Sequence, residues 1–224
     1  MIRKYLHATF PGLILQPSLY HQWDIGIHFK LSEDLYQFQS ETTELNFKYF
    51  NQVYNQAISL FNDIFSNDDE LFLVTNLYQR KDYGRSSKRK MKTYHHYIKD
   101  KSVRYNLMQE TLPYIFDDEE DTEENSTSQF SLKCCKQDIR YILLIKAICN
   151  QDFPPLKPRL HNPNGLYELD VFFINVTKNV ILYIYDDRGC EVIARDIEMI
   201  RPLYEKYAIL IDEYDRKEVE QKFG

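Results

Sequence analysis

Glycine is scarce in this chain, with only 6 among 224 residues. A glycine-rich nucleotide loop needs several closely spaced glycines, so that backbone N–H groups can approach the phosphates. The sequence also contains no Gly-x-Ser-x-Gly and no His-Glu-x-x-His motif, which are the marks of the α/β-hydrolases and of many zinc proteases. We therefore expect no cofactor, and no familiar catalytic motif supports an enzyme.

Cysteine is present only at Cys134, Cys135, Cys149 and Cys190. There is no Cys-x-x-Cys pair to bind zinc, and two adjacent cysteines resemble no disulfide framework. We expect reduced, partly buried thiols in a cytoplasmic protein. Cys149 or Cys190 could act as a nucleophile only beside a base that the sequence does not place, and both lie in apolar segments, where a thiol is usually inert.

Long hydrophobic runs are also missing. The longest apolar stretch, from Tyr141 to Cys149, is interrupted by Lys146 and is far too short to cross a bilayer. No apolar run of signal-peptide length follows the first five residues. We therefore expect no membrane partner and a cytoplasmic location.

Aromatic residues are abundant, at 15% with 18 Tyr and 14 Phe, and this favours sheet structure. The segment from Trp23 to Phe29 alternates apolar and polar side chains, which predicts a half-buried strand. A helix is predicted from about Glu44 to Phe65, with Thr43 as its N-cap and Asn67-Asp68-Asp69 after its end. Apolar residues recur at steps of three and four, which places them on one buried face of this helix. They are Phe47, Phe50, Tyr54, Ala57, Ile58, Phe61 and Phe65.

The remaining pattern predicts further strands and helices. Strands are expected at Leu71–Val74, at Phe130–Cys134, and in a C-terminal meander at Leu169–Asn175, Val180–Tyr185 and Cys190–Ala194. Helices are expected at Ile139–Cys149, from Pro202 to about Tyr207, and at the C-terminus, where Asp215 and Glu218 resemble a capping box. We predict one α+β domain over residues 1–224, with an antiparallel-rich mixed sheet that is packed by helices.

Two opposite charge blocks lie in the middle of the chain. Residues 80–104 carry ten basic side chains against Asp82 and Asp100, and residues 110–124 carry eight carboxylates and no base. The blocks are either interaction surfaces or neighbouring solvated loops that neutralise each other. Together with the expected linker Asn125–Ser128, they predict a charged, mobile segment at about 80–129.

Each block suggests a partner. The basic block is interleaved with Tyr83, Tyr94 and Tyr97, a combination that suits single-stranded nucleic acid. The net charge of −6 and the pI near 5.6 oppose this, so we expect nucleic acid to be an unlikely partner. The acidic block offers candidate binding residues for a basic protein, namely Asp117, Asp118, Glu119 and Glu120.

Asp186, Asp187, Arg188 and Glu191 form the densest polar group beside predicted strands. Paired carboxylates next to an arginine could hold a metal or act as acid and base. A tight turn explains them more simply, because Asp favours early turn positions and Gly189 would accept a positive φ. His21, Asp24 and His28 would not converge from a strand, so we expect no metal site.

The C-terminal third has a specific pattern. Tyr185-Asp186-Asp187-Arg188-Gly189-Cys190-Glu191-Val192-Ile193-Ala194 is followed by Arg201-Pro202-Leu203-Tyr204-Glu205-Lys206-Tyr207 and Asp215-Arg216. This pattern resembles a bacterial family catalogued only as a domain of unknown function. The resemblance extends upstream through Leu112–Tyr114, Phe130–Cys134, Asp138–Tyr141 and Ala147–Phe153, and more weakly to Trp23-Asp24-Ile25-Gly26-Ile27. The resemblance implies a single-domain bacterial protein and transfers no catalytic residue.

The function that these observations favour is a non-catalytic protein-binding protein of the antitoxin or toxin-immunity type. The protein is acidic, its carboxylates are concentrated in one run that could mimic a phosphate backbone, and it lacks a catalytic or cofactor signature. Its partner would be a basic protein such as a toxin domain, while its oligomeric state is not predicted. The alternative is an enzyme or binding protein acting on nucleic acid or a phosphorylated substrate, with Asp186, Asp187 and Arg188 beside the basic block.

Overall fold

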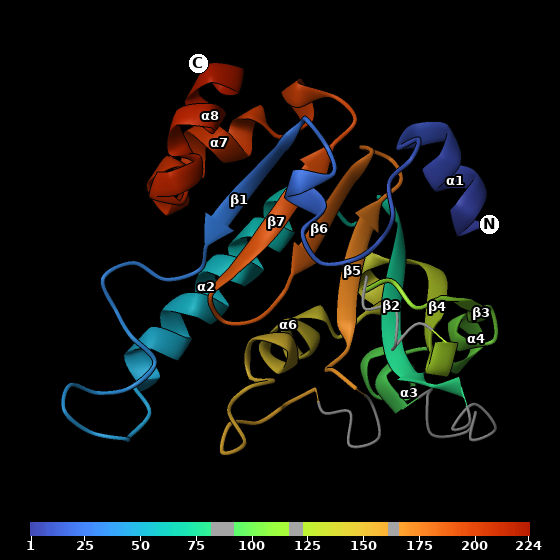
Figure 1. Cartoon of the computed structure of the whole chain (residues 1–224), viewed down its shortest axis with the longest axis horizontal. Coiled ribbons are helices and arrows are strands. Elements are labelled where there is room, and N and C mark those ends of the chain that lie inside the picture. Colours follow the sequence, from blue (N-terminus) through green and yellow to red (C-terminus); the bar gives the residue numbers. More distant parts are fainter. Residues whose placement is uncertain (82–91, 117–122, 161–165) are drawn as a thin grey trace.

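A seven-stranded sheet forms the centre of the computed structural model, which describes residues 1–81, 92–116, 123–160 and 166–224 (Figure 1). The strands are β1 (Gly26–Lys30), β2 (Glu70–Arg80), β3 (Met108–Pro113), β4 (Asn125–Cys135), β5 (Asp170–Asn175), β6 (Val180–Ile184) and β7 (Gly189–Ala194). Their order is β1-β7-β6-β5-β2-β4-β3, and each neighbouring pair among these strands is antiparallel. The predicted single α+β domain is confirmed, without a parallel pair in the described sheet.

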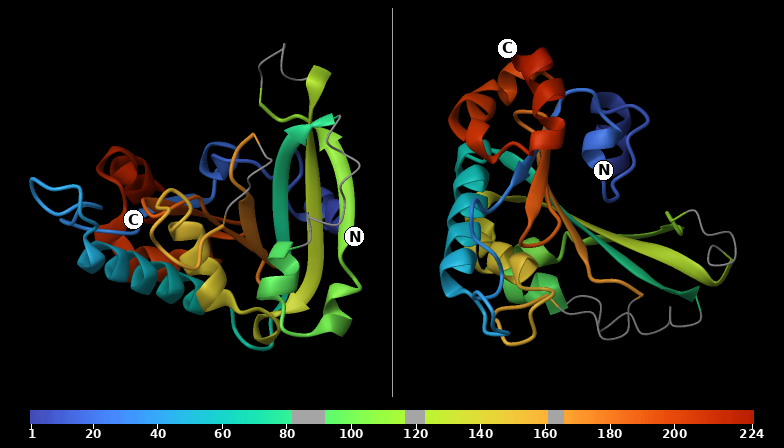
Figure 2. Two further views of the ribbon diagram at one scale, coloured as in Figure 1. Left: turned by 90° about the horizontal axis from the view of Figure 1, so that it is seen from below. Right: turned by 60° about the vertical axis from the view of Figure 1, so that its left-hand side comes forward.

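The helices lie on both sides of the sheet. They are α1 (Ile2–Thr9), α2 (Phe47–Ile64), α3 (Lys92–Tyr97), α4 (Lys101–Arg104), α6 (Tyr141–Cys149), α7 (Arg201–Tyr207) and α8 (Glu213–Phe223). Figure 2 shows α2 and α6 along one face and α1 on the other, and a separate apolar cluster lies on each face. No helix in the described parts of the chain is long and apolar enough to cross a membrane.

The C-terminal meander is confirmed within one or two residues at each boundary. Asn179 closes the turn between β5 and β6 with a φ of 55°, and asparagine tolerates this left-handed region better than most residues. The turn sets the register, in which Asn175 pairs with Val180. The apolar residues of all three strands are therefore buried on both faces of the sheet.

Helix α2 is also confirmed, and Phe50 and Phe61 on its predicted face are buried against the sheet. The predicted N-cap Thr43 is wrong. The cap is Asn46, whose side-chain oxygen accepts hydrogen bonds from the backbone N–H of Lys48 at 3.2 Å and of Tyr49 at 3.5 Å. Because the helix begins later than predicted, Phe47 lies at its first position and is 64% exposed.

Two strands are longer than the sequence predicts. β2 extends to Arg80, where Leu71–Val74 was expected, and β4 begins at Asn125, so Asn125–Ser128 is a strand and not a linker. These polar halves pair with each other, with Arg80 opposite Asn125. The range 80–129 thus contains α3, α4, β3 and the start of β4, while its mobility stays a prediction.

The final helix begins earlier than predicted. Its N-cap is Asp212, whose side chain accepts a hydrogen bond from the backbone N–H of Tyr214 at 3.0 Å. The capping role predicted for Asp215 is therefore wrong. Asp215 lies in the first turn of α8 and is directed to β1, where it contacts His28.

Candidate functional site

The turn between β6 and β7 brings together three of the predicted site residues, Asp186, Asp187 and Arg188. Asp186 accepts hydrogen bonds from the backbone N–H of Arg188 at 2.7 Å and from its Nε at 2.8 Å, and it forms an ion pair with the same guanidinium. Asp186 is buried, whereas the Arg188 side chain is largely exposed. One carboxylate of the pair therefore stabilises its own turn.

Asp187 points in another direction, into the core, and is 2% exposed. It accepts a hydrogen bond from the Tyr49 hydroxyl of α2 at 2.6 Å and another from the Gln37 amide at 3.1 Å. Burial raises the pKa of Asp187 above its ordinary value, and the neighbouring Asp186 carboxylate adds to this rise. The same burial raises the pKa of Tyr49, so Tyr49 stays a hydrogen-bond donor at neutral pH.

A third carboxylate joins this pair from the chain after α6. One oxygen each of Asp152, Asp186 and Asp187 lies within 4.8 Å of the other two. Desolvation and the Asp186 charge raise the pKa of Asp152. Carboxylate oxygens at this spacing could hold a hard cation such as Ca²⁺ or Mg²⁺, although Asp186 and Asp187 already accept hydrogen bonds from Arg188 and Tyr49.

Gly189 follows the turn as the first residue of β7 and pairs with Lys30 of β1. Its backbone does not have the positive φ that the turn was expected to need, so that prediction is wrong. Position 189 requires glycine because there is no room for a side chain. A Cβ added to Gly189 would lie 2.7 Å from the Phe29 carbonyl oxygen and 2.7 Å from Tyr185 Cζ, and it would overlap the Tyr185 hydroxyl.

A second polar group lies beside the turn on β1. Asp215 of α8 contacts His28 Nδ1 at 2.9 Å, and the Tyr185 hydroxyl contacts His28 Nε2 at 2.9 Å. Glu191 lies opposite His28 in the β1–β7 pair and accepts a hydrogen bond from the backbone N–H of Tyr20 at 3.3 Å. His28 thus links the turn to the last helix, a role that its local sequence does not indicate.

The other candidate residues are less available for chemistry. Among the described residues, the only group spaced for a metal is the Asp152, Asp186 and Asp187 cluster, so His21, Asp24 and His28 do not form one. Cys149 and Cys190 are fully buried, and burial raises the pKa of both thiols. Their predicted inertness follows from this burial.

The candidate binding residues Asp117, Asp118, Glu119 and Glu120 lie outside the described residues. At their described ends the two charge blocks meet. Arg80 at the end of β2 contacts Glu124 at 2.5 Å, and Lys81 Nζ donates to the Glu123 carbonyl oxygen at 2.6 Å. These contacts favour the interpretation that the blocks partly neutralise each other.

Two of the three tyrosines interleaved with the basic block are buried, which agrees with the expectation that nucleic acid is an unlikely partner. Tyr94 is buried, with its hydroxyl 3.1 Å from the Phe130 carbonyl oxygen and 3.3 Å from that of Leu73. Tyr97 is 4% exposed, and burial raises its pKa. Neither ring is open for stacking on a base, because both tyrosines pack α3 against the rest of the chain. Tyr83 lies outside the described residues.

Comparisons with known proteins identify the family. The model of a domain of unknown function, DUF3885, matches residues 2–215. The uncharacterized protein YnaE of Bacillus subtilis (strain 168) is 46% identical over 213 residues, covering 94% of this chain and 96% of that protein. No solved structure matches the chain. The chain therefore belongs to the DUF3885 family, as its C-terminal pattern indicates.

Proposed function

We propose that this protein is a non-catalytic protein-binding protein of the antitoxin or toxin-immunity type, and that it acts in the cytoplasm on a basic partner such as a toxin domain. The observation that carries the proposal is the edge of the sheet at β3. Within the described residues, β3 pairs only with β4. Its other side therefore presents backbone donors and acceptors to which a strand of another protein can add.

The two edges of the sheet differ in this respect. β1, at the opposite edge, forms a bridge to the C-terminal segment through Phe29 and Ile211, and α8 contacts it through Asp215. β3 carries mostly exposed side chains and includes Pro113, a residue found on edge strands. Within the described parts of the chain, the β3 edge is thus the more accessible of the two, with an ion pair from Arg3 of α1 to Glu110 as its contact beyond β4.

A largely apolar hollow of about 610 Å³ lies at the start of β3, with Asn106, Ser131 and Lys133 as the polar part of its lining. Tyr105, which is 76% exposed, and Met108, which is 55% exposed, line it beside Met1, Phe72 and Leu107. Exposed aromatic and methionine side chains around a hollow are typical of the anchoring part of a protein interface. This hollow could accept an apolar side chain next to an added strand.

Charge supports a basic partner. The acidic run from Asp117 to Glu124 follows β3 in the sequence, whereas Glu110 on the strand itself is ion-paired with Arg3 of α1 at 2.6 Å. Complementary charges accelerate encounter and discourage wrong partners. Asp186 is bound by Arg188 and Asp187 by Tyr49, so both carboxylates of the turn make structural contacts.

Co-expression with the product of a neighbouring toxin gene tests the proposal. We expect this protein to restore growth and to bind the toxin domain with an affinity that falls as salt rises. Met108→Lys should weaken binding at least about tenfold, whereas Met199→Lys, at an exposed methionine of the turn before α7, should not. No neighbouring toxin gene and no protection, or equal effects of the two variants, would overturn the proposal.

A further inference from the structure

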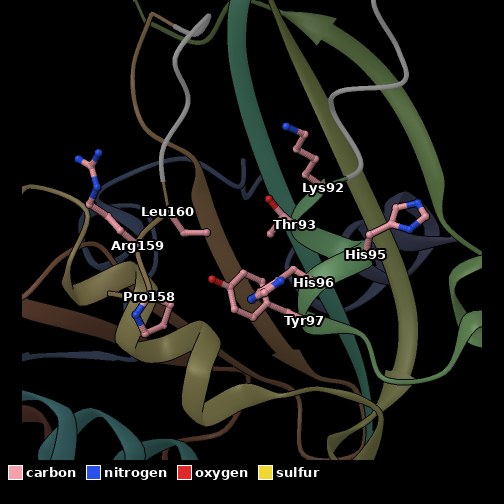
Figure 3. Close-up of a pocket in the computed structure, with 8 residues that line it drawn as sticks. All are labelled: Lys92, Thr93, His95, His96, Tyr97, Pro158, Arg159 and Leu160. Atoms are coloured by element: carbon pink, nitrogen blue, oxygen red, sulfur yellow. The ribbon is translucent and has the colours of Figure 1, made fainter. Parts of the chain in front are cut away.

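A hollow of about 480 Å³ lies between α3 and the segment Pro158–Leu160 and shares no lining residue with the turn or with β3 (Figure 3). This is the size of pocket that accommodates a small organic ligand. Its lining includes Lys92, Thr93 and Tyr97 of α3 and, on the facing segment, Pro158, Arg159 and Leu160.

The charge of this hollow has one sign. Lys92 on one wall and Arg159 on the other are cations, and none of the described residues that line it is a carboxylate. Figure 3 shows Lys92, Thr93 and Tyr97 extending from α3 toward the facing segment. His95 points away from them and contacts Arg104 Nη1 through its Nδ1 at 3.0 Å. In a protein of net charge −6, such a concentration of positive charge selects an anion.

Both walls are held in place by the chain around α6. On the α3 side, the Tyr97 carbonyl oxygen accepts the backbone N–H of Arg140 at 2.7 Å. On the other side, the Pro158 carbonyl oxygen accepts the Asn150 amide at 2.7 Å, and Arg159 Nη1 donates to the Gln151 carbonyl oxygen at 3.2 Å. The backbone of both walls is therefore positioned before a ligand arrives, which lowers the entropic cost of binding.

We infer that this hollow binds a small organic phosphate, specifically a phosphomonoester of about nucleotide size. A phosphate group accepts charge-assisted hydrogen bonds from Lys92, Arg159 and hydroxyl donors such as Thr93. Pro158 and Leu160 offer apolar contact to the organic part. The inference is independent of the proposed partner binding, because the hollow shares no residue with the β3 edge.

Isothermal titration at low salt with inorganic phosphate and with adenosine monophosphate as probes tests this inference. We expect adenosine monophosphate to bind more tightly, since only it fills the apolar part, and its affinity should fall as salt rises. Lys92→Ala and Arg159→Ala should each weaken binding about tenfold or more. Lys101→Ala removes a nearby cation from α4 outside the hollow and should leave binding unchanged.

Three outcomes would overturn the inference. The first is no binding of either probe to the full-length protein. The second is an equal effect of Lys92→Ala and Lys101→Ala, which would mean that general surface charge is responsible. The third is much tighter binding of a 5′-phosphorylated oligonucleotide than of adenosine monophosphate, which would assign the surface to nucleic acid. Lys92 is exposed, so its substitution tests binding even if Arg159→Ala lowers stability.

Discussion

Gly189→Ala gives the sharpest test of how the turn is built. The new methyl group would lie 2.7 Å from the carbonyl oxygen of Phe29, which belongs to β1 and cannot rotate away. It would also overlap the Tyr185 hydroxyl, which is held by His28. Overpacking in a well-packed region costs about 1–3 kcal/mol, and the fixed backbone oxygen places this change near about 3 kcal/mol.

For a protein of this length, about 1 kcal/mol corresponds to about 2–4 °C in melting temperature. We therefore expect Gly189→Ala to lower the melting temperature by about 6–12 °C in a thermal scan. Gly12→Ala is the matched control, because Gly12 has a φ of +85° and open space around it. Its cost should come from backbone strain alone, about 1 kcal/mol.

The two changes together separate crowding from backbone strain. Gly189→Ala should be less harmful in a Tyr185→Phe background, because the variant ring lacks the hydroxyl that the methyl group overlaps. A loss no larger than that of Gly12→Ala, or no coupling to Tyr185→Phe, would refute the account of Gly189 as a residue required by space.

Four further predictions concern charge and burial. Burial raises the pKa of Asp170 from 3.8 to about 6, although the Tyr78 and Tyr183 hydroxyls donate to it. Because the folded pKa is the higher one, stability should fall by up to about 3 kcal/mol as pH rises from about 4 to about 6. Asp170→Asn should remove this pH dependence of the free energy of unfolding, as measured by denaturant titrations at several pH values. An unchanged pH dependence would contradict the raised pKa of Asp170. Asp187→Asn should change stability at pH 7 by less than about 1 kcal/mol, because an amide can still bond to both neighbours of that buried carboxylate; a large drop in melting temperature would show otherwise. Among the four thiols, only Cys135 is not buried, so a thiol reagent should modify at most that one in the native protein and all four in denaturant. Replacing the acidic cluster with amides (Asp117→Asn, Asp118→Asn, Glu119→Gln and Glu120→Gln) should unmask weak, salt-sensitive nucleic-acid binding, and no gain at low salt would mean that the basic block is only a solvated surface.

The parts of the fold that the sequence predicts are those with a strong periodicity. The meander strands are continuous apolar runs bounded by turn residues, and α2 has an apolar stripe, so local pattern is sufficient for both. The second half of β2 and the first half of β4 are mostly polar, and they are buried because they pair with each other. The first half of β4 also pairs with β3, and Tyr78 of β2 packs against Tyr114, Phe116 and Tyr167. Such burial depends on the tertiary partner, which no local pattern contains.

The candidate site shows the same limit. Asp186, Asp187 and Arg188 are adjacent in the sequence, so their proximity could be predicted. Tyr49 lies 138 residues from Asp187, and its hydroxyl reaches the carboxylate only because α2 packs beneath the turn. Asp152 also lies outside the sequence motif, although the break after α6 at Pro154 marks its segment as a loop that can approach another element.

The sheet order also determines when the chain can fold during synthesis. β1 lies between β7 and the C-terminal segment, and the Trp23 indole donates to the Ala194 carbonyl oxygen, 171 residues away. A nascent chain emerging from the ribosome has no strand partner for β1 until β7, more than 150 residues later, has been translated. The early apolar residues around Ile27 and Phe29 must stay exposed or protected by a chaperone for most of that time. Premature termination anywhere before β7 would leave this strand without its sheet and expose it to aggregation.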